Sequence, residues 1–276
     1  MSRQISYFIE GGDNVGKTTL IDHITQNFTE DYKKEFTKSI SFFINKYPTK
    51  DNTEFMNVIN KVLRFCNDWK TLISKDEKYH DLYSKVNNLL INTMIKDMDK
   101  SLIDTVPRGK KNSWNYINIS DRGPLSTFLY NYTKDPIYDT ITNFNVFILK
   151  YLIPIYEEYT CANYSYNLES TIGNTNIIIL NNNKPDIPIV SDKKEDIEYK
   201  KNFDNDCMLQ DRINSDIQDI VKAIDNNPDI SILTYPFKLY YINIYHIDGT
   251  RKTTEEVYEE FKKLIFNTIK EENNNE

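Results

Sequence analysis

The chain has 276 residues, a length that suits one α/β domain with insertions and a substantial core. Its formal net charge of -7 argues against a polynucleotide as the main ligand, because phosphate backbones require a basic surface. Three separated cysteines, Cys66, Cys161 and Cys207, lack zinc or redox spacing, and no stretch approaches the apolar length of a membrane span. We expect reduced thiols in a cytosol-like compartment, no membrane contact and no secretory signal.

The predicted elements alternate between strand and helix from the start of the chain. Residues 5–9 form an apolar run, followed by a glycine-containing turn and an amphipathic stretch from Leu20. This order predicts strand, loop and helix. A second strand is expected at 39–44, followed by helical patterns at about 54–70 and 79–102.

The middle of the chain repeats the alternation after a break. Residues 104–113 contain proline, glycine and a basic cluster, which predicts a surface loop. A third strand is predicted at 116–120. Pro124 fits the first turn of a helix that runs to residue 132, and a further helix is expected at 137–159.

The last part of the chain supplies two more strands. Residues 176–180 are a clear apolar run, and a fifth strand is expected at 239–247. Helices are expected at 207–224 and 254–269. The segment at about 191–206, between the fourth strand and the first of these helices, is highly charged and has little apolar periodicity, which predicts a mobile lid.

The alternation predicts one α/β domain over residues 1–270, with a flexible tail at 271–276. Strands separated by helices form a mostly parallel sheet that is covered on both faces. Ligands of such folds bind at the carboxyl ends of the strands. The two sharpest motifs of this sequence both fall there.

The first motif is a phosphate loop, with two glycines five residues apart and a Lys-Thr pair after the second. Its members are Gly11, Gly12, Asp13, Asn14, Val15, Gly16, Lys17 and Thr18. Such a loop curls so that its backbone N–H groups, and the N-terminus of the next helix, face phosphate oxygens. Lys17 is expected to reach the β- and γ-phosphates of ATP, and Thr18 to ligate Mg²⁺.

The second motif is Asp121-Arg122 at the end of the third strand, with Ser126 and Tyr130 on the following helix. The aspartate can hold a metal ion through water, and the arginine can clamp a phosphate with its planar fork. A helix-terminus ion pair is the alternative interpretation of the same two residues.

Together these segments resemble the thymidylate kinase family. The resemblance lies in 8–13 with Gly16-Lys17-Thr18-Thr19, in Tyr47-Pro48-Thr49-Lys50, and in Asp121-Arg122 followed by Ser126-Thr127 and Tyr130-Asn131. It implies a P-loop three-layer sandwich with a central parallel sheet of about five strands in the order 2-3-1-4-5, flanked by helices, plus a lid. It also implies small-molecule nucleotide ligands, no nucleic acid, and a homodimer.

The resemblance implies a role for each matched residue. Asp13 would approach the sugar 3′-hydroxyl of the acceptor, Arg122 and Lys50 would hold its phosphate, and Tyr130 would pack beside the deoxyribose. The further expected contacts are Ser126 on the acceptor side, Thr19 on the ATP side, Arg251 or Lys252 near the adenine of ATP, and the lid lysines Lys193, Lys194, Lys200 and Lys201. The implied reaction transfers the γ-phosphate of ATP to dTMP.

The sequence also departs from the family pattern. Gly123 stands in place of a tyrosine, Asn131 of a glutamine and Lys50 of an arginine, while Asn14 stands where some members carry an arginine. Residues 89–96 offer neither the base-stacking Phe nor the base-reading Arg of the family. Two alternatives stay open: a deoxynucleoside kinase with Glu10 as base, and a non-catalytic ATP-binding regulatory module.

Overall fold

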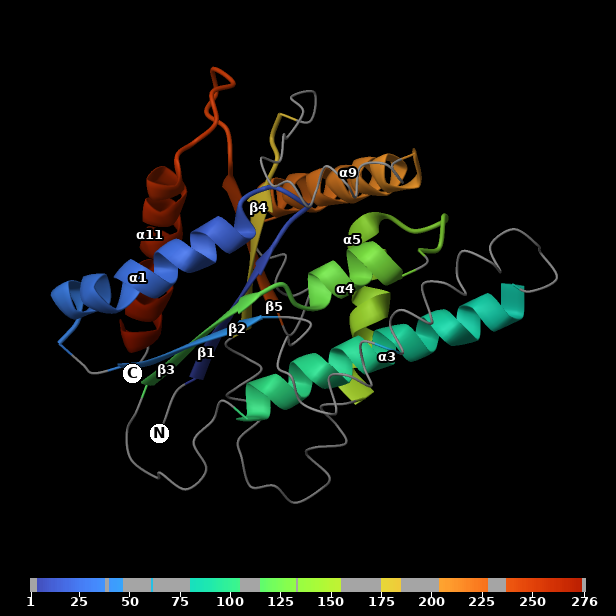
Figure 1. The fold of residues 1–276 in the computed structure, drawn as a ribbon, viewed down its shortest axis with the longest axis horizontal. Coiled ribbons are helices and arrows are strands. Elements are labelled where there is room, and N and C mark those ends of the chain that lie inside the picture. The colour runs from blue at the N-terminus through green and yellow to red at the C-terminus, as the bar shows by residue number, and fades with distance from the viewer. Residues whose placement is uncertain are drawn as a thin grey trace.

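The central element of the fold is a five-stranded parallel sheet (Figure 1). The computed structural model describes residues 4–37, 40–46, 61, 80–104, 115–132, 134–154, 175–184, 204–227 and 237–274. The strands are β1 (Gln4–Glu10), β2 (Ile40–Lys46), β3 (Asn115–Asp121), β4 (Thr175–Asn181) and β5 (Phe237–Asn243). Their order across the sheet is β2-β3-β1-β4-β5, which confirms the predicted fold class.

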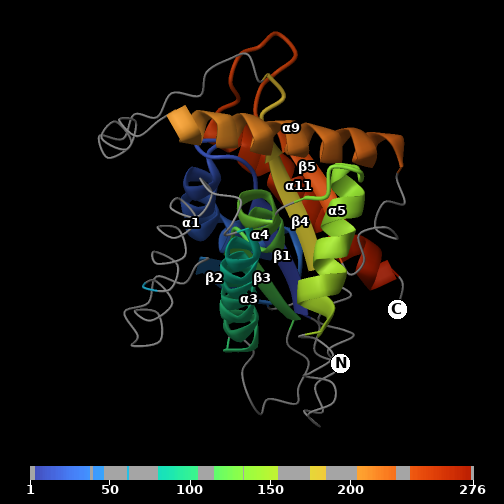
Figure 2. The same ribbon diagram turned by 90° about the vertical axis from the view of Figure 1, so that its right-hand side faces the viewer.

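Helices cover both faces of the sheet, as Figures 1 and 2 show. On one face lie α1 (Lys17–Glu35) and α11 (Thr254–Asn274), which pack against each other. The other face carries α3 (His80–Asp104), α4 (Pro124–Asn131), α5 (Thr140–Phe147) with a π-helical turn (Ile148–Leu152), and α9 (Asp204–Asn226). None of the helices in the described part of the chain is both long enough and apolar enough to cross a bilayer.

The period-two alternation of the strands divides the core into two layers. In β1, Tyr7 and Ile9 are buried on the side of α1 and α11, where Phe28 and Phe261 complete the packing. Phe8 points to the opposite side, into the cluster formed with α3, α4, α5 and α9. Both faces of β1 are therefore apolar, as expected for a central parallel strand.

Most predicted elements lie within a few residues of where the sequence places them, but several ends differ; the helix expected at 137–159, for example, starts at Thr140. The fifth strand ends at Asn243, not at residue 247, because the chain folds back and Tyr245 pairs with Arg251. The last helix continues to Asn274, so most of the expected flexible tail is helical. Helix α9 starts at Asp204, inside the expected lid; the rest of the lid and nearly all of the predicted helix 54–70 lie outside the described residues.

The order of the strands determines where the motifs meet. Strand β1 lies between β3 and β4, and Ile9 of β1 is in register with Asp121 of β3. The phosphate loop after β1 and the Asp121-Arg122 motif at the end of β3 therefore lie side by side at the carboxyl edge of the sheet. This edge is the usual ligand site of such sheets.

Candidate active site

The phosphate loop connects β1 to α1 in a tightly constrained conformation. Gly11 has a φ of 142°, and a Cβ atom there would lie 2.7 Å from the carbonyl oxygen of Leu180. Gly16 has a φ of 100° immediately before α1. Asn14 also has a positive φ, 62°, which asparagine tolerates better than most residues. Both glycines of the motif are thus required by backbone conformation.

Lys17 lies inside this loop. Its side chain is buried, and Nζ donates hydrogen bonds to the carbonyl oxygens of Gly12 and of Gly11, the latter at 3.0 Å. Burial lowers the pKa of the ammonium to about 8, against the opposing charges of Asp13 and Glu10. The loop therefore holds a positive group at its centre, while the following residues Thr18 and Thr19 are exposed.

Asp13 connects the phosphate loop to two other segments. Its Oδ1 accepts hydrogen bonds from Arg122 Nη2 and from the Tyr130 hydroxyl, both at 2.8 Å, and its Oδ2 accepts one from Gln210 Nε2 at 2.8 Å. Burial favours the neutral acid, but the charge and hydrogen bonds of Arg122 keep the pKa of Asp13 below its usual value. The sequence motifs around Asp13 and Arg122 thus meet at one carboxylate.

Arg122 is held in an uncommon backbone conformation. Its φ is 73°, and its N–H donates to the carbonyl oxygen of Ile9 at 3.0 Å. The guanidinium lies 5.2 Å from the centre of the Tyr130 ring, within reach of a cation–π contact. A non-glycine residue at positive φ costs free energy and is concentrated at functional sites. This conformation is evidence that the position of Arg122 matters for more than packing.

Glu10 and Ser126 form a buried contact next to this cluster. The Glu10 carboxylate is completely buried and accepts hydrogen bonds from the backbone N–H and the hydroxyl of Ser126. Burial raises the pKa of Glu10 to about 6, although the bonds from Ser126 act in the opposite direction. Ser126 thus ties the first turn of α4 to the end of β1. Its expected contact with an acceptor stays a prediction.

Asp121 is the carboxylate that was expected to hold a metal ion, and this role stays a prediction. Its buried carboxylate lies 3.3 Å from Lys46 Nζ at the end of β2. The described residues contain no cluster of three or more His, Cys, Asp or Glu that could hold a metal alone. Mg²⁺ usually takes one or two protein oxygens and completes its shell with phosphates and water. Asp121 and the exposed Thr18 hydroxyl provide oxygen donors of that kind.

Lys46 and Gln210 also belong to the site, although no sequence pattern marks either residue. Lys46 is in register with Asp121, and its side chain is 44% exposed beside that carboxylate. Gln210, on α9, holds Asp13 at the side chain and also accepts from its backbone N–H at 3.2 Å. Lys50 and the lid lysines 193, 194, 200 and 201 lie outside the described residues.

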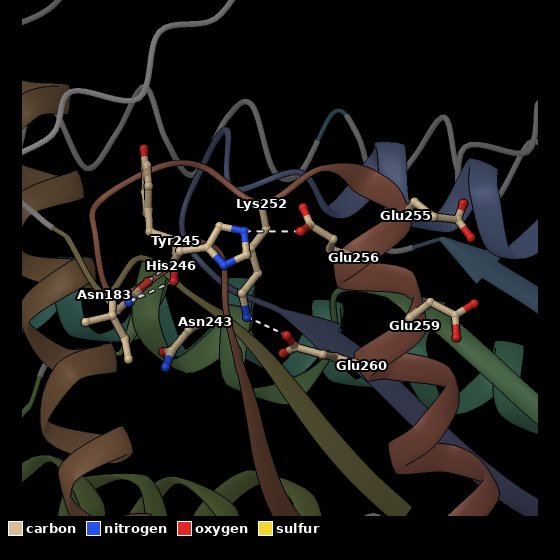
Figure 3. Close-up of a pocket in the computed structure, with 10 residues that line it drawn as sticks. Asn183, Asn243, Tyr245, His246, Lys252, Glu255, Glu256, Glu259 and Glu260 are labelled. Atoms are coloured by element: carbon tan, nitrogen blue, oxygen red, sulfur yellow. Dashed lines mark hydrogen bonds and ion pairs between the residues drawn. The ribbon is translucent and has the colours of Figure 1, made fainter.

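The two residues that were expected to contact ATP are neighbours in the loop between β5 and α11, but their side chains contact different partners. Arg251 donates from Nη2 to the carbonyl oxygen of Asn14 at 2.9 Å. Lys252 instead lies in a pocket of about 540 Å³ lined by the loop and the first turns of α11, where it pairs with Glu260 (Figure 3). In the same pocket His246 faces Glu256 at 3.2 Å.

A scan against protein-family models finds no match, and a search of curated proteins finds no relative. Among solved structures, thymidylate kinase from Ehrlichia chaffeensis is similar with a TM-score of 0.44, 15% identity, and coverage of 95% of this chain and 99% of that chain. For thymidylate kinase from Candida albicans the values are 0.40, 15%, 100% and 95%. For deoxyadenosine kinase from M. mycoides they are 0.35, 16%, 96% and 99%. With all three scores below 0.5, the fold assignment rests on the strand order and the phosphate loop.

Proposed function

We propose that this protein is a nucleotide kinase that transfers the γ-phosphate of ATP to a deoxynucleoside monophosphate, with dTMP as the favoured acceptor. One observation carries the proposal: the phosphate loop and the β3–α4 segment share a single polar cluster through Asp13 and Arg122. The residues that bind the donor and those that bind the acceptor must lie this close for direct transfer between two bound nucleotides.

On the donor side, the chain supplies a preformed cradle. The N-terminus of α1 and the loop N–H groups receive the phosphates, and Lys17 exchanges its carbonyl partners for phosphate oxygens. Thr18 and Asp121 would hold Mg²⁺, which when bound neutralises phosphate charge. Lys46 would then release Asp121 and become available to the acceptor phosphate.

On the acceptor side, Arg122 would bind the monophosphate and Tyr130 would pack beside the deoxyribose. Asp13 is placed between them, where its carboxylate can accept a hydrogen bond from a sugar hydroxyl. An acceptor phosphate oxygen attacks the γ-phosphorus, the bond to the bridging oxygen breaks, and ADP leaves. No base is needed, since the attacking oxygen is already ionised.

The nucleoside-kinase alternative needs such a base for the 5′-hydroxyl. Glu10 was the candidate, but its carboxylate is completely buried and bonded twice to Ser126. This placement favours the monophosphate as acceptor.

The test is an acceptor panel with ATP and Mg²⁺, in which thymidine, dTMP and the other deoxynucleotides are offered separately. We expect product from dTMP and none from thymidine. Lys17→Met should reduce the rate at least a hundredfold, since it removes the central phosphate contact while circular dichroism stays unchanged. Phosphorylation of thymidine alone would establish the nucleoside kinase instead, and transfer to no acceptor would support the regulatory module.

A further inference from the structure

The segment between β5 and α11 is a hydrogen-bonded hairpin. Residues Tyr245 and Arg251 pair across it, while His246 N–H bonds to the Thr250 carbonyl at 2.8 Å and Lys252 N–H to the Ile244 carbonyl at 2.9 Å. At its tip, the Asp248 carboxylate accepts bonds from the backbone and side chain of Thr250, and Gly249 supplies a φ of 89°. The backbone at Arg251 is therefore fixed on its N-terminal side.

The start of α11 fixes the same position from its other side. Thr253 and Glu256 form a reciprocal capping box: Thr253 Oγ1 accepts from the Glu256 N–H at 3.2 Å, and Glu256 Oε2 accepts from the Thr253 N–H at 2.8 Å. The backbone of Arg251 thus lies between a hydrogen-bonded hairpin and a capped helix, and it needs little further ordering when a ligand binds.

From this position the guanidinium reaches the phosphate loop. One nitrogen, Nη2, is bonded to the Asn14 carbonyl and lies 3.9 Å from where a Cβ of Gly16 would be. Gly16 immediately precedes the first turn of α1, whose free N–H groups attract anions. The neighbouring Lys252 extends into the pocket toward Glu260 (Figure 3). The side chains of the adjacent residues Arg251 and Lys252 thus contact different parts of the protein.

The charge of Arg251 is not compensated by a carboxylate in the described part of the chain. The ion pairs there include Arg122 with Asp13, Lys46 with Asp121 and Lys252 with Glu260, but none with Arg251. Its side chain is exposed. A guanidinium has five N–H donors, so the bond to Asn14 leaves most of the fork free. An arginine fixed beside a phosphate cradle with an unused fork is suited to bidentate phosphate recognition.

We propose that Arg251 binds the phosphates of the donor nucleotide, as a second cation beside Lys17, and not its base. The proposal deepens the proposed function and rests on it only in requiring that a triphosphate occupies the phosphate loop. It assigns Arg251 to the phosphate end of ATP.

The test uses inorganic tripolyphosphate, a donor analogue without base or sugar. It competes with a ribose-labelled fluorescent ATP for the full-length protein, and ATP is measured alongside. Arg251→Met and Arg251→Gln should weaken tripolyphosphate and ATP about equally, by about tenfold or more. Arg251→Lys should retain part of the affinity, because it keeps the charge but not the fork. Lys222→Met on α9, which also removes one exposed positive charge, should change neither affinity.

Three results would overturn the proposal. If Arg251→Met weakens ATP but not tripolyphosphate, the residue contacts the base. If Arg251→Gln binds tripolyphosphate like the unmodified protein, the side chain only supports the Asn14 carbonyl. If the unmodified protein does not bind tripolyphosphate, there is no phosphate site to complete. None of these measurements requires phosphate transfer, so an acceptor panel without product would defeat the proposed function and leave this inference standing.

Discussion

Glu10 and Lys17 place opposite charges at the two ends of the phosphate loop, and both are buried. Burial shifts the pKa of both groups: it raises the pKa of Glu10 to about 6 and lowers the pKa of Lys17 to about 8. Near neutral pH both groups are mostly charged, so the site holds an ionised carboxylate without contact with water. The Glu10 carboxylate makes two local interactions: it holds α4 through Ser126, and it balances the charge of Lys17.

This arrangement makes stability depend on pH in a defined direction. The Glu10 pKa is about 6 in the folded protein and has its ordinary value of 4.5 in the unfolded chain. The folded state therefore binds this proton more tightly than the unfolded chain does, so protonation of Glu10 stabilises the fold. This stabilisation is lost as pH rises from 4.5 through 6. Glu10→Gln removes this dependence and should raise the free energy of unfolding by about 2 kcal/mol at pH 8 but not at pH 4.

Denaturant unfolding of both proteins at the two pH values measures this difference. Glu30→Gln, at an exposed position of α1, is the matched control and should change stability by less than about 0.5 kcal/mol at either pH. A Glu10→Gln protein that is no more stable than the unmodified protein at pH 8 would contradict the assignment of burial as the main effect.

Single residues also mark how much of the site the sequence predicts. The phosphate loop is predictable because one continuous segment supplies its glycines, its lysine and its hydroxyls. Arg122 follows from its place after a strand. Gln210 does not, since its contact with Asp13 joins residues 197 positions apart and a glutamine on a helix carries no pattern. Lys46 likewise depends on the pairing of β2 with β3.

At the scale of elements, the entry of the chain into α4 is controlled by packing against β1. Gly123 has an extended φ of −176°, so its backbone needs no glycine. A Cβ at this position, however, would lie 2.4 Å from Cδ1 of Phe8, in the core layer below α4. The glycine that departs from the family pattern is thus matched to a phenylalanine on the neighbouring strand.

Gly123→Ala should therefore destabilise the protein by about 1–3 kcal/mol, the usual cost of an overpacked core. The strain falls on the segment that carries Arg122, so acceptor binding should weaken as well. Phe8→Leu frees part of the space, and the double variant should recover some of the loss in a double-mutant cycle followed by denaturant unfolding. Simple additivity of the two losses would show that the contact is not the cause.

At the scale of the whole molecule, alternating strand and helix patterns are enough to predict a parallel sheet, but they do not determine where each element stops. The apolar pattern continues past Asn243 through Ile244 and Tyr245, which are buried, to Ile247, which is 98% exposed at the hairpin. Periodicity cannot register that reversal. It also cannot predict the π-helical turn after α5, because apolar residues continue through it. The order of the strands was predicted only from the resemblance to the thymidylate kinase family, because no local sequence pattern specifies it.

The whole fold should respond to donor binding, because the sheet edge, α1, α4, α9 and the hairpin all meet at the phosphate loop. A ligand that binds only the folded state stabilises it by about 2.7 kcal/mol at a hundred times its Kd. ATP with Mg²⁺ should thus raise the melting temperature by several degrees, and AMP, with a single phosphate, should raise it less. Lys17→Met should lose most of the ATP effect, because it removes the positive group at the centre of the loop that would hold the phosphates. An equal shift with ATP in both proteins, measured by differential scanning calorimetry, would place the triphosphate outside the loop and remove the common basis of the donor and acceptor assignments.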